Sequence, residues 1–236
     1  MLARNEEKTK QAIEDIKKAV PDSTGQMVFI RLDLADLTTI RASAEQFLQM
    51  ENQLHLLFNN AGLAFAKSGL KSEQGYEIQL GVNCLGSFAL TNLLTPTIVS
   101  TAKTAPTNSV RVIWVSSNAA ELSSPDNFLD SVKNVENLDW VSRYCVSKLG
   151  NYLHAAEFAN RHRADGIMSV PLNPGALDSE LWRDWSSLTV QFMRATVLHP
   201  VIYGAYTCMF AAFSPEISRE TSGTQGKFYI PGRYGT

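Results

Sequence analysis

Short apolar segments alternate with longer segments of helical character along this chain. The apolar segments are rich in β-branched residues and have strand lengths. The predicted strands are residues 27–34, 54–58, 110–116, 168–172 and 226–231. The predicted helices are residues 5–19, 38–50, 75–102, 141–163 and further material up to about residue 213. Because strands that are apolar on both faces must be covered on both faces, this order predicts an α/β fold, a doubly wound parallel sheet with helices on either side.

Length and charge narrow the class of protein. The 236 residues contain no repeat or linker, which predicts one domain over residues 1–236. The net charge of −2 gives no reason to expect nucleic acid as a partner. Three widely spaced cysteines, without a CxxC pair, favour a reduced, cytoplasmic protein. The four histidines have no metal-ligand spacing, so no metal is predicted.

The N-terminus and residues 195–215 are the segments where a targeting or membrane signal could lie. The N-terminus contains no apolar run and predicts no secretory signal. Residues 195–215 carry no charge, which approaches the length of a membrane span. His199, Pro200 and Gly204 interrupt this stretch, and a proline at a helix start favours two buried pieces instead.

Four segments lie at the carboxyl ends of the predicted strands, and three of them consist of small or turn-forming residues. They are Asp33, the NNAG turn at residues 59–62, the Ser116-Ser117 pair and the NPG turn at residues 173–175. Ligands of an open parallel sheet bind at the carboxyl ends of its strands. Each segment alone is compatible with an ordinary strand-to-helix turn. Their joint occurrence predicts a ligand site along this edge.

Tyr144 and Lys148 lie four residues apart on a predicted helix, and therefore on one face. A free tyrosine titrates near pH ~10. A cation about 4 Å away, at an effective dielectric near 20, is worth roughly 4 kcal/mol, or about three pKa units. The spacing therefore predicts a Tyr144 pKa near neutrality, suited to general acid/base catalysis. A surface Tyr/Lys pair on an ordinary helix is the alternative interpretation of this pattern alone.

Taken in order, these motifs resemble the short-chain dehydrogenase/reductase family, closest to its retinol-dehydrogenase-like and fungal secondary-metabolism members. The resemblance implies a Rossmann-like sheet and an NAD(P)-dependent oxidoreductase. The matching segments are LDLADL (32–37), NNAG (59–62), GVNCLGSF (81–88), VSS (115–117), YCVSK (144–148) and NPG (173–175).

The resemblance implies four catalytic roles. Tyr144 would exchange a proton with the substrate oxygen while hydride moves to or from the nicotinamide. Lys148 would lower the Tyr144 pKa and hold the nicotinamide ribose, and Ser117 would hydrogen-bond the substrate oxygen. Ser117 lies further from Tyr144 than is usual in the family, and the polar, loop-like insertion at residues 118–139 accounts for this. Asn83 would organise a proton-relay water; a solvent-facing asparagine is its alternative interpretation.

The resemblance also implies cofactor contacts. Asp33 would accept a hydrogen bond from the adenine amino group, and Pro174 with Gly175 would pass under the nicotinamide. Arg4, just past the family's second strand, implies pairing with a 2′-phosphate and hence NADP rather than NAD. A solvated N-terminal arginine is the alternative. The adenosine and ribose would be lined by Asn60, Ala61 and Gly62.

The family's glycine-rich TGxxxGxG loop does not occur in the sequence, whose first glycine is Gly25. We therefore expect an N-terminally truncated Rossmann-like fold, with the first strand and this loop absent. One interpretation is a shortened form of a normal dehydrogenase. The other is a non-redox descendant, such as a cyclase, isomerase or binding protein, that uses Tyr144 and Ser117 without nicotinamide. The intact later motifs favour the first.

The segment after NPG, residues 177–197, is rich in apolar and aromatic side chains. It predicts a lid over a hydrophobic small-molecule substrate. The alternative is that Trp182 and Trp185 pack on the core. Peripheral contact with a membrane is less favoured, because no cluster of basic residues flanks this segment. The resemblance also implies a possible homodimer through the helices at residues 75–102 and 141–163.

Overall fold

The computed structural model describes residues 1–182, 185–218 and 222. The described strands are β1 (Leu2–Ala3), β2 (Ile30–Arg31), β3 (Leu56–Asn59), β4 (Arg111–Val115) and β5 (Met168–Leu172). The described α-helices are α1 (Glu6–Ala19), α2 (Leu37–Met50), α3 (Ser87–Ala102), α4 (Phe128–Lys133), α5 (Trp140–Arg161), α6 (Ser187–Thr196) and α7 (Val201–Phe213). The predicted strand at residues 226–231 lies outside the described residues.

The five described strands pair in parallel, as the sequence predicted, and they form two sheets. β1 pairs with β2, and β4 lies between β3 and β5 in a three-stranded sheet. In the larger sheet Asn59 lies opposite Trp114, and Trp114 lies opposite Pro171. Because the strands are parallel and in step, the residues that follow β3, β4 and β5 emerge at one edge.

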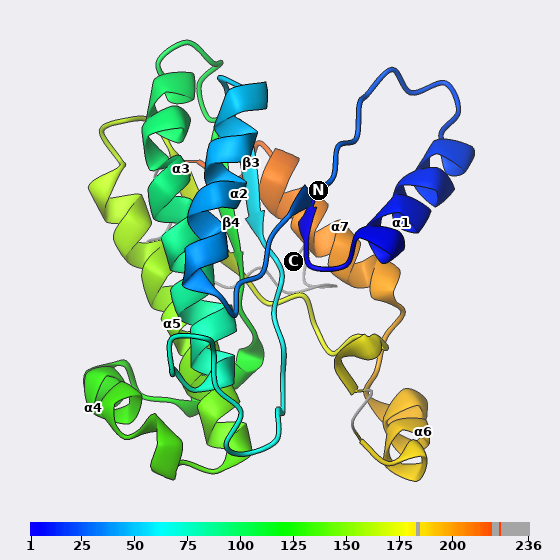
Figure 1. The fold of residues 1–236 in the computed structure, drawn as a ribbon, viewed down its shortest axis with the longest axis vertical. Helices are drawn as coiled ribbons and strands as arrows, with labels where there is room; N and C mark the ends of the chain where they lie inside the picture. The colour runs from blue at the N-terminus through cyan, green and yellow to red at the C-terminus, as the bar shows by residue number, and fades with distance from the viewer. Residues whose placement is uncertain (183–184, 219–221, 223–236) are drawn as a thin grey trace.

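Alternating side chains of β4 point into cores on opposite faces of the sheet. Val112 and Trp114 belong to a buried cluster with residues of α2 and α3, whereas Ile113 and Val115 belong to a second cluster with Ala211 of α7. In Figure 1, α2, α3 and α5 accordingly lie to one side of the strands and α7 to the other. This confirms the α/β fold with helices on both faces of a parallel sheet.

Two predicted elements are shorter than expected. The predicted strand at residues 27–34 is reduced to Ile30–Arg31, because its partner β1 offers only two residues for pairing. The predicted helix at residues 75–102 begins at Leu80. Gly75 adopts a positive φ of 82°, and an antiparallel bridge joins Lys71 to Glu77. The first seven residues of the helix, Leu80–Gly86, form a π-helical segment, η1, that continues into α3.

The segment at residues 118–139 is not the simple loop that its polar composition predicted. It contains 3₁₀ turns and the helix α4. Three apolar residues explain this, because Val132, Val135 and Leu138 recur at helical spacing and pack against Leu80 and Cys84 of η1. The insertion thereby covers the helix that leads into the site.

The uncharged stretch at residues 195–215 forms the end of α6 and the 13-residue helix α7, with Pro200 at the N-cap of α7. Helix α7 buries Gly204, Thr207 and Ala211. Among the described helices, Leu80–Ala102 is long and apolar enough to cross a membrane by length and composition, but 50% of its apolar window is buried inside the protein. It is therefore a core helix.

Gly86 of η1 packs closely against Leu34, which follows β2, and this contact leaves no room for a side chain at Gly86. A Cβ atom there would lie 2.7 Å from the Leu34 carbonyl oxygen and 2.8 Å from the Leu34 Cβ. We expect Gly86→Ala to lower the free energy of unfolding by about 1–2 kcal/mol, even after the roughly 1 kcal/mol gain in helix propensity. Urea unfolding measures this.

Gly25→Ala is the matched control for that substitution. Its added methyl group would meet only the Ser23 hydroxyl, at 3.4 Å, in an exposed segment. We expect a change within about 0.5 kcal/mol. Equal changes in the two variants would contradict the close approach at Gly86.

Candidate active site

A cavity of about 680 Å³ lies at the carboxyl edge of the larger sheet. It is lined by residues that follow β3, β4 and β5, together with residues of α5 and α7. Among its lining residues are seven that the sequence predicted for a site: Asn60, Gly62, Ser117, Tyr144, Lys148, Pro174 and Gly175. The topology therefore brings together segments that are distant in the sequence, as expected for a parallel sheet.

Helix α5 positions Tyr144 and Lys148 on one buried face. The helix begins at Trp140 because the Asp139 carboxylate caps it, accepting hydrogen bonds from the backbone N–H groups of Val141 (2.9 Å) and Ser142 (3.1 Å). The Lys148 ammonium donates a 2.9 Å hydrogen bond to the carbonyl oxygen of Val115, the last residue of β4. Helix and strand end are thereby fixed to each other.

The pKa of Tyr144 differs from the one that the helical spacing predicted. The Lys148 Nζ lies 5.8 Å from the centre of the Tyr144 ring, over its face. Burial raises the pKa of Tyr144 to about 12, and the side-chain hydrogen bond with Ser117 opposes this only in part. The expected Tyr144 pKa near neutrality is therefore wrong for this structure, because loss of water around the phenol outweighs any help from the lysine.

Burial also lowers the pKa of Lys148, to about 8. The cause is the loss of hydration of the ammonium group, which has one protein acceptor at Val115. At neutral pH Tyr144 is thus a phenol and most Lys148 side chains still carry a proton. The pair can donate protons rather than accept them in this state.

Asn83 lies in η1 and is fully buried, which excludes the solvent-facing interpretation. Its side-chain amide donates to the Leu63 carbonyl oxygen and accepts from the Leu63 N–H, both at 2.8 Å. The amide also donates to the Ser147 hydroxyl at 3.0 Å. Asn83 therefore joins the turn after β3 to the helix that carries Tyr144, which fixes the floor of the cavity.

Three predicted cofactor residues do not line this cavity. Arg4 and Ala61 are exposed, and Asp33 follows β2 of the smaller sheet. One carboxylate oxygen of Asp33 accepts a 2.9 Å hydrogen bond from the Ala35 N–H, which stabilises the turn before α2. Ala61 lies between two residues that do line the cavity, Asn60 and Gly62, but is itself directed elsewhere, whereas Asp33 and Arg4 follow strands of the other sheet.

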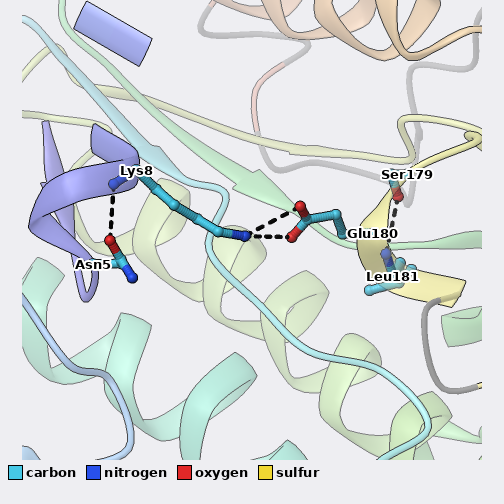
Figure 2. A network of polar contacts seen from close by, with 5 residues as sticks. All are labelled: Asn5, Lys8, Ser179, Glu180 and Leu181. Atoms are coloured by element: carbon cyan, nitrogen blue, oxygen red, sulfur yellow. Dashed lines mark hydrogen bonds and ion pairs between the residues drawn. The ribbon is translucent and has the colours of Figure 1, made fainter. Parts of the chain in front are cut away.

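Helix α1 contacts the segment that follows β5. Figure 2 shows Lys8 of α1 reaching the carboxylate of Glu180, with the Lys8 Nζ 3.2 Å from Oε1 and 3.3 Å from Oε2. Both side chains are largely exposed, so this ion pair contributes little stability. It nevertheless joins the N-terminal helix to the rim of the cavity, five residues after Gly175.

Sequence reasoning missed Phe65 and Gln79. Phe65 lines the cavity, and the fully buried Gln79 side chain accepts a 2.8 Å hydrogen bond from the Phe65 N–H. The signal for Gln79 was its position four residues before Asn83, which places two amide side chains on one face of an apolar helix. The contribution of α7, through Gly204 and Cys208, was also missed.

The described residues contain no group of three histidine, cysteine or acidic side chains that could hold a metal ion. One Cys–His pair occurs, with the Cys84 Sγ 3.2 Å from the His154 Nε2. Burial raises the pKa of Cys84 to about 12 and lowers that of His154 to about 4. Both groups are therefore neutral at pH 7, and the pair does not form a reactive thiolate.

The buried lysine makes stability depend on pH. Above about pH 8 folded Lys148 loses its proton, whereas the unfolded chain binds it up to a pKa near 10.5, so its contribution to the free energy of unfolding rises with pH. We expect the difference between wild type and Lys148→Met to shift in favour of wild type by about 1–2 kcal/mol between pH 8 and 10.

Urea unfolding at several pH values measures this difference. Subtracting the variant removes the contributions of groups that titrate in the same range and do not contact Lys148, such as Cys84. A difference that stays constant from pH 7 to 10 would mean that Lys148 titrates normally in the folded state.

A sequence profile for the short chain dehydrogenase family matches residues 1–188. A short-chain dehydrogenase/reductase of Phomopsis amygdali is 48% identical over 228 residues, covering 93% of this chain and 67% of the relative. A short-chain dehydrogenase/reductase of Emericella nidulans is 44% identical, covering 94% of this chain and 72% of the relative.

An NADPH-bound carbonyl reductase from chicken fatty liver has a similar fold. Its TM-score is 0.65 at 18% identity, over 94% of this chain and 81% of the reductase. This chain belongs to the short-chain dehydrogenase/reductase family of oxidoreductases.

Proposed function

We propose that this chain is an NADP-dependent oxidoreductase that interconverts a carbonyl and an alcohol on a hydrophobic small molecule, with residues 1–236 acting as one domain. The observation that carries the proposal is the meeting of Ser117, Tyr144 and Lys148 around one cavity of about 680 Å³. The rest of that cavity includes apolar side chains such as Leu177 and Leu181. A polar end beside an apolar wall suits a small molecule with one reacting oxygen.

The protonation states favour carbonyl reduction as the step that the structure is ready to perform. Tyr144 is a phenol at neutral pH because its pKa is about 12, so it can give its proton to a carbonyl oxygen that is becoming an alkoxide. Bound NADPH would supply the hydride to the carbonyl carbon. Ser117, which lines the same cavity as Tyr144, would hold the same oxygen. Lys148 would stabilise the tyrosinate left behind and be the nearest source of a replacement proton.

The cavity suits the nicotinamide half of the cofactor. A Cβ atom at Gly62 would lie 3.0 Å from the Asn83 Oδ1 and 3.5 Å from the Lys148 Nζ, so a glycine lets this turn lie close to both side chains at the cavity. Asn60, Pro174 and Gly175 line the same space. The carbonyl reductase from chicken fatty liver, which shares the fold, binds NADPH. The sequence supplies no glycine-rich turn for the pyrophosphate, so the fit covers the nicotinamide half only.

One alternative function needs no dinucleotide. Tyr144 and Ser117 could serve a cyclase, an isomerase or a binding protein of this family instead of an oxidoreductase. The same proton donor and hydrogen-bonding hydroxyl would serve those reactions without hydride transfer. Binding of the dinucleotide separates the two functions.

The other expectations from the sequence stay predictions. They are a substrate from secondary metabolism, a cytoplasmic location with possible peripheral membrane contact, and pairing of two copies through α3 and α5. The exposed Arg4 remains the basis for preferring NADP over NAD.

Titration of the purified chain with NADPH and NADH, followed by nicotinamide fluorescence, tests the cofactor. We expect NADPH to bind about tenfold more tightly than NADH, since a charge-assisted contact from Arg4 to the 2′-phosphate is worth roughly 1.5 kcal/mol. Arg4→Ala should remove the preference, and Arg41→Ala, an exposed arginine in α2, should keep it. Absence of binding by either dinucleotide would contradict NADP as the cofactor of this chain.

Tyr144→Phe tests the proton donor. We expect the NADPH dissociation constant to change by less than about threefold, and turnover of a bulky apolar ketone to fall by about 10²–10⁴-fold, since the variant lacks the acid. Tyr206→Phe, on an exposed part of α7, is the matched control and should keep wild-type turnover. Turnover that survives in Tyr144→Phe would exclude Tyr144 as the acid.

A further inference from the structure

Tyr144, the proposed proton donor, is one of five aromatic residues whose rings meet. Phe65 is at their centre and contacts the other four. Its ring centre lies 5.2 Å from that of Trp140, 5.0 Å from Tyr144, 5.5 Å from Trp182 and 5.3 Å from Trp185. Trp182 lies nearly parallel to the Phe65 ring, with 27° between the planes, and Trp140 is close to perpendicular at 78°. We call these five residues the aromatic cluster.

The Phe65 backbone is held in an uncommon conformation. Its φ of 56° lies in the left-handed region that residues other than glycine rarely adopt. The buried Gln79 side chain accepts the Phe65 N–H and donates a 3.1 Å hydrogen bond to the Trp140 carbonyl oxygen. One fully buried amide thus fixes two members of the aromatic cluster relative to each other. Strain that is maintained in this way occurs most often at functional sites.

Core packing does not account for the aromatic cluster. Trp114, the tryptophan of the buried core, is fully buried, whereas Trp140 is 40% exposed and Phe65, Trp182 and Trp185 are partly exposed. The rings border open space on two sides. Phe65, Tyr144 and Trp182 line the cavity of about 680 Å³, and Phe65, Trp140 and Trp185 line a second cavity of about 450 Å³.

A carbonyl group held by Ser117 and Tyr144 would place its substituent against these rings. Aromatic faces and edges attract other aromatic rings more strongly than saturated rings of the same size, because the ring quadrupoles are complementary. A purely apolar wall, in contrast, would favour the saturated ring, which has the larger hydrophobic surface. A preference for an aromatic over a saturated ring would therefore show that the rings of the aromatic cluster bind the substituent by aromatic pairing.

We propose that the aromatic cluster is a binding site for an aromatic ring of the substrate and that Phe65 determines this specificity, so that the site takes aryl ketones and aryl carbinols. The proposal rests on the proposed function for the position of the carbonyl group at Tyr144. Beyond that function, it specifies that the group attached to the carbonyl carbon is an aromatic ring. Ring recognition itself requires no hydride transfer, and it can be measured without the dinucleotide.

The test compares 2-acetylnaphthalene with its fully saturated decalin analogue by isothermal titration calorimetry of the chain without dinucleotide. We expect the naphthyl ketone to bind about 3- to 10-fold more tightly, as aromatic pairing predicts. Phe65→Leu keeps an apolar side chain and the same backbone, and should bring the ratio of the two dissociation constants to about one. Phe213→Leu, at an exposed position of α7 away from both cavities, should keep the wild-type ratio.

Trp182→Leu is a second variant, in case Phe65→Leu does not fold, and it should reduce the ratio as well. Equal affinities for the two ketones in wild type, absence of saturable binding of the naphthyl ketone, or an unchanged ratio in both variants would overturn the proposal. Failure of the proposed function has a different signature. The naphthyl ketone would still bind preferentially, but NADPH would not bind and the ketone would not be reduced.

Discussion

The carbonyl oxygen of Val115, at the last residue of β4, holds α5 against the edge of the sheet. It accepts hydrogen bonds from the Lys148 ammonium at 2.9 Å and from the Asn151 side chain at 3.3 Å. One residue further along, the Ser116 hydroxyl donates to the Lys148 carbonyl oxygen at 2.7 Å. Because these bonds join a strand end to the middle of α5, they fix where Tyr144 lies relative to the residues that follow β3 and β5. The rest of the cavity depends on that contact.

The same contact places two titratable groups where most of each side chain is buried. Burial raises the pKa of Tyr144 to about 12 and lowers that of Lys148 to about 8, so each group is shifted toward its neutral form. Neither shift benefits folding, since each reflects a charged form that the fold disfavours. Buried groups with shifted pKa values that meet in a cavity are candidates for a functional site. A pKa of about 12 leaves Tyr144 able to donate a proton at neutral pH but not to accept one.

Much of this site was predictable, because parallel topology brings the strand ends together. Ser117, Gly62 and Gly175 could be placed at one edge from the order of strands and turns alone. The extent of a strand was less predictable: the apolar segment at residues 27–34 pairs over only two residues, because its length depends on the partner strand. The Tyr144 pKa also depends on burial, which helical spacing cannot report. The role of Phe65 required its φ of 56° and its bond to Gln79, neither of which a local pattern reveals.

A ligand that contacted both sheets would touch two parts of the fold that are connected in different ways. The residues around Tyr144 belong to the three-stranded sheet and are joined to it by hydrogen bonds, whereas Asp33 and Arg4 follow strands of the two-stranded sheet. No described ladder of backbone hydrogen bonds connects the two sheets; packing does, through Leu34 against Gly86 and through a shared buried core. The position of Tyr144 relative to the ends of β4 and β5 is therefore fixed by hydrogen bonds, whereas its position relative to Asp33 and Arg4 depends on packing between the two sheets.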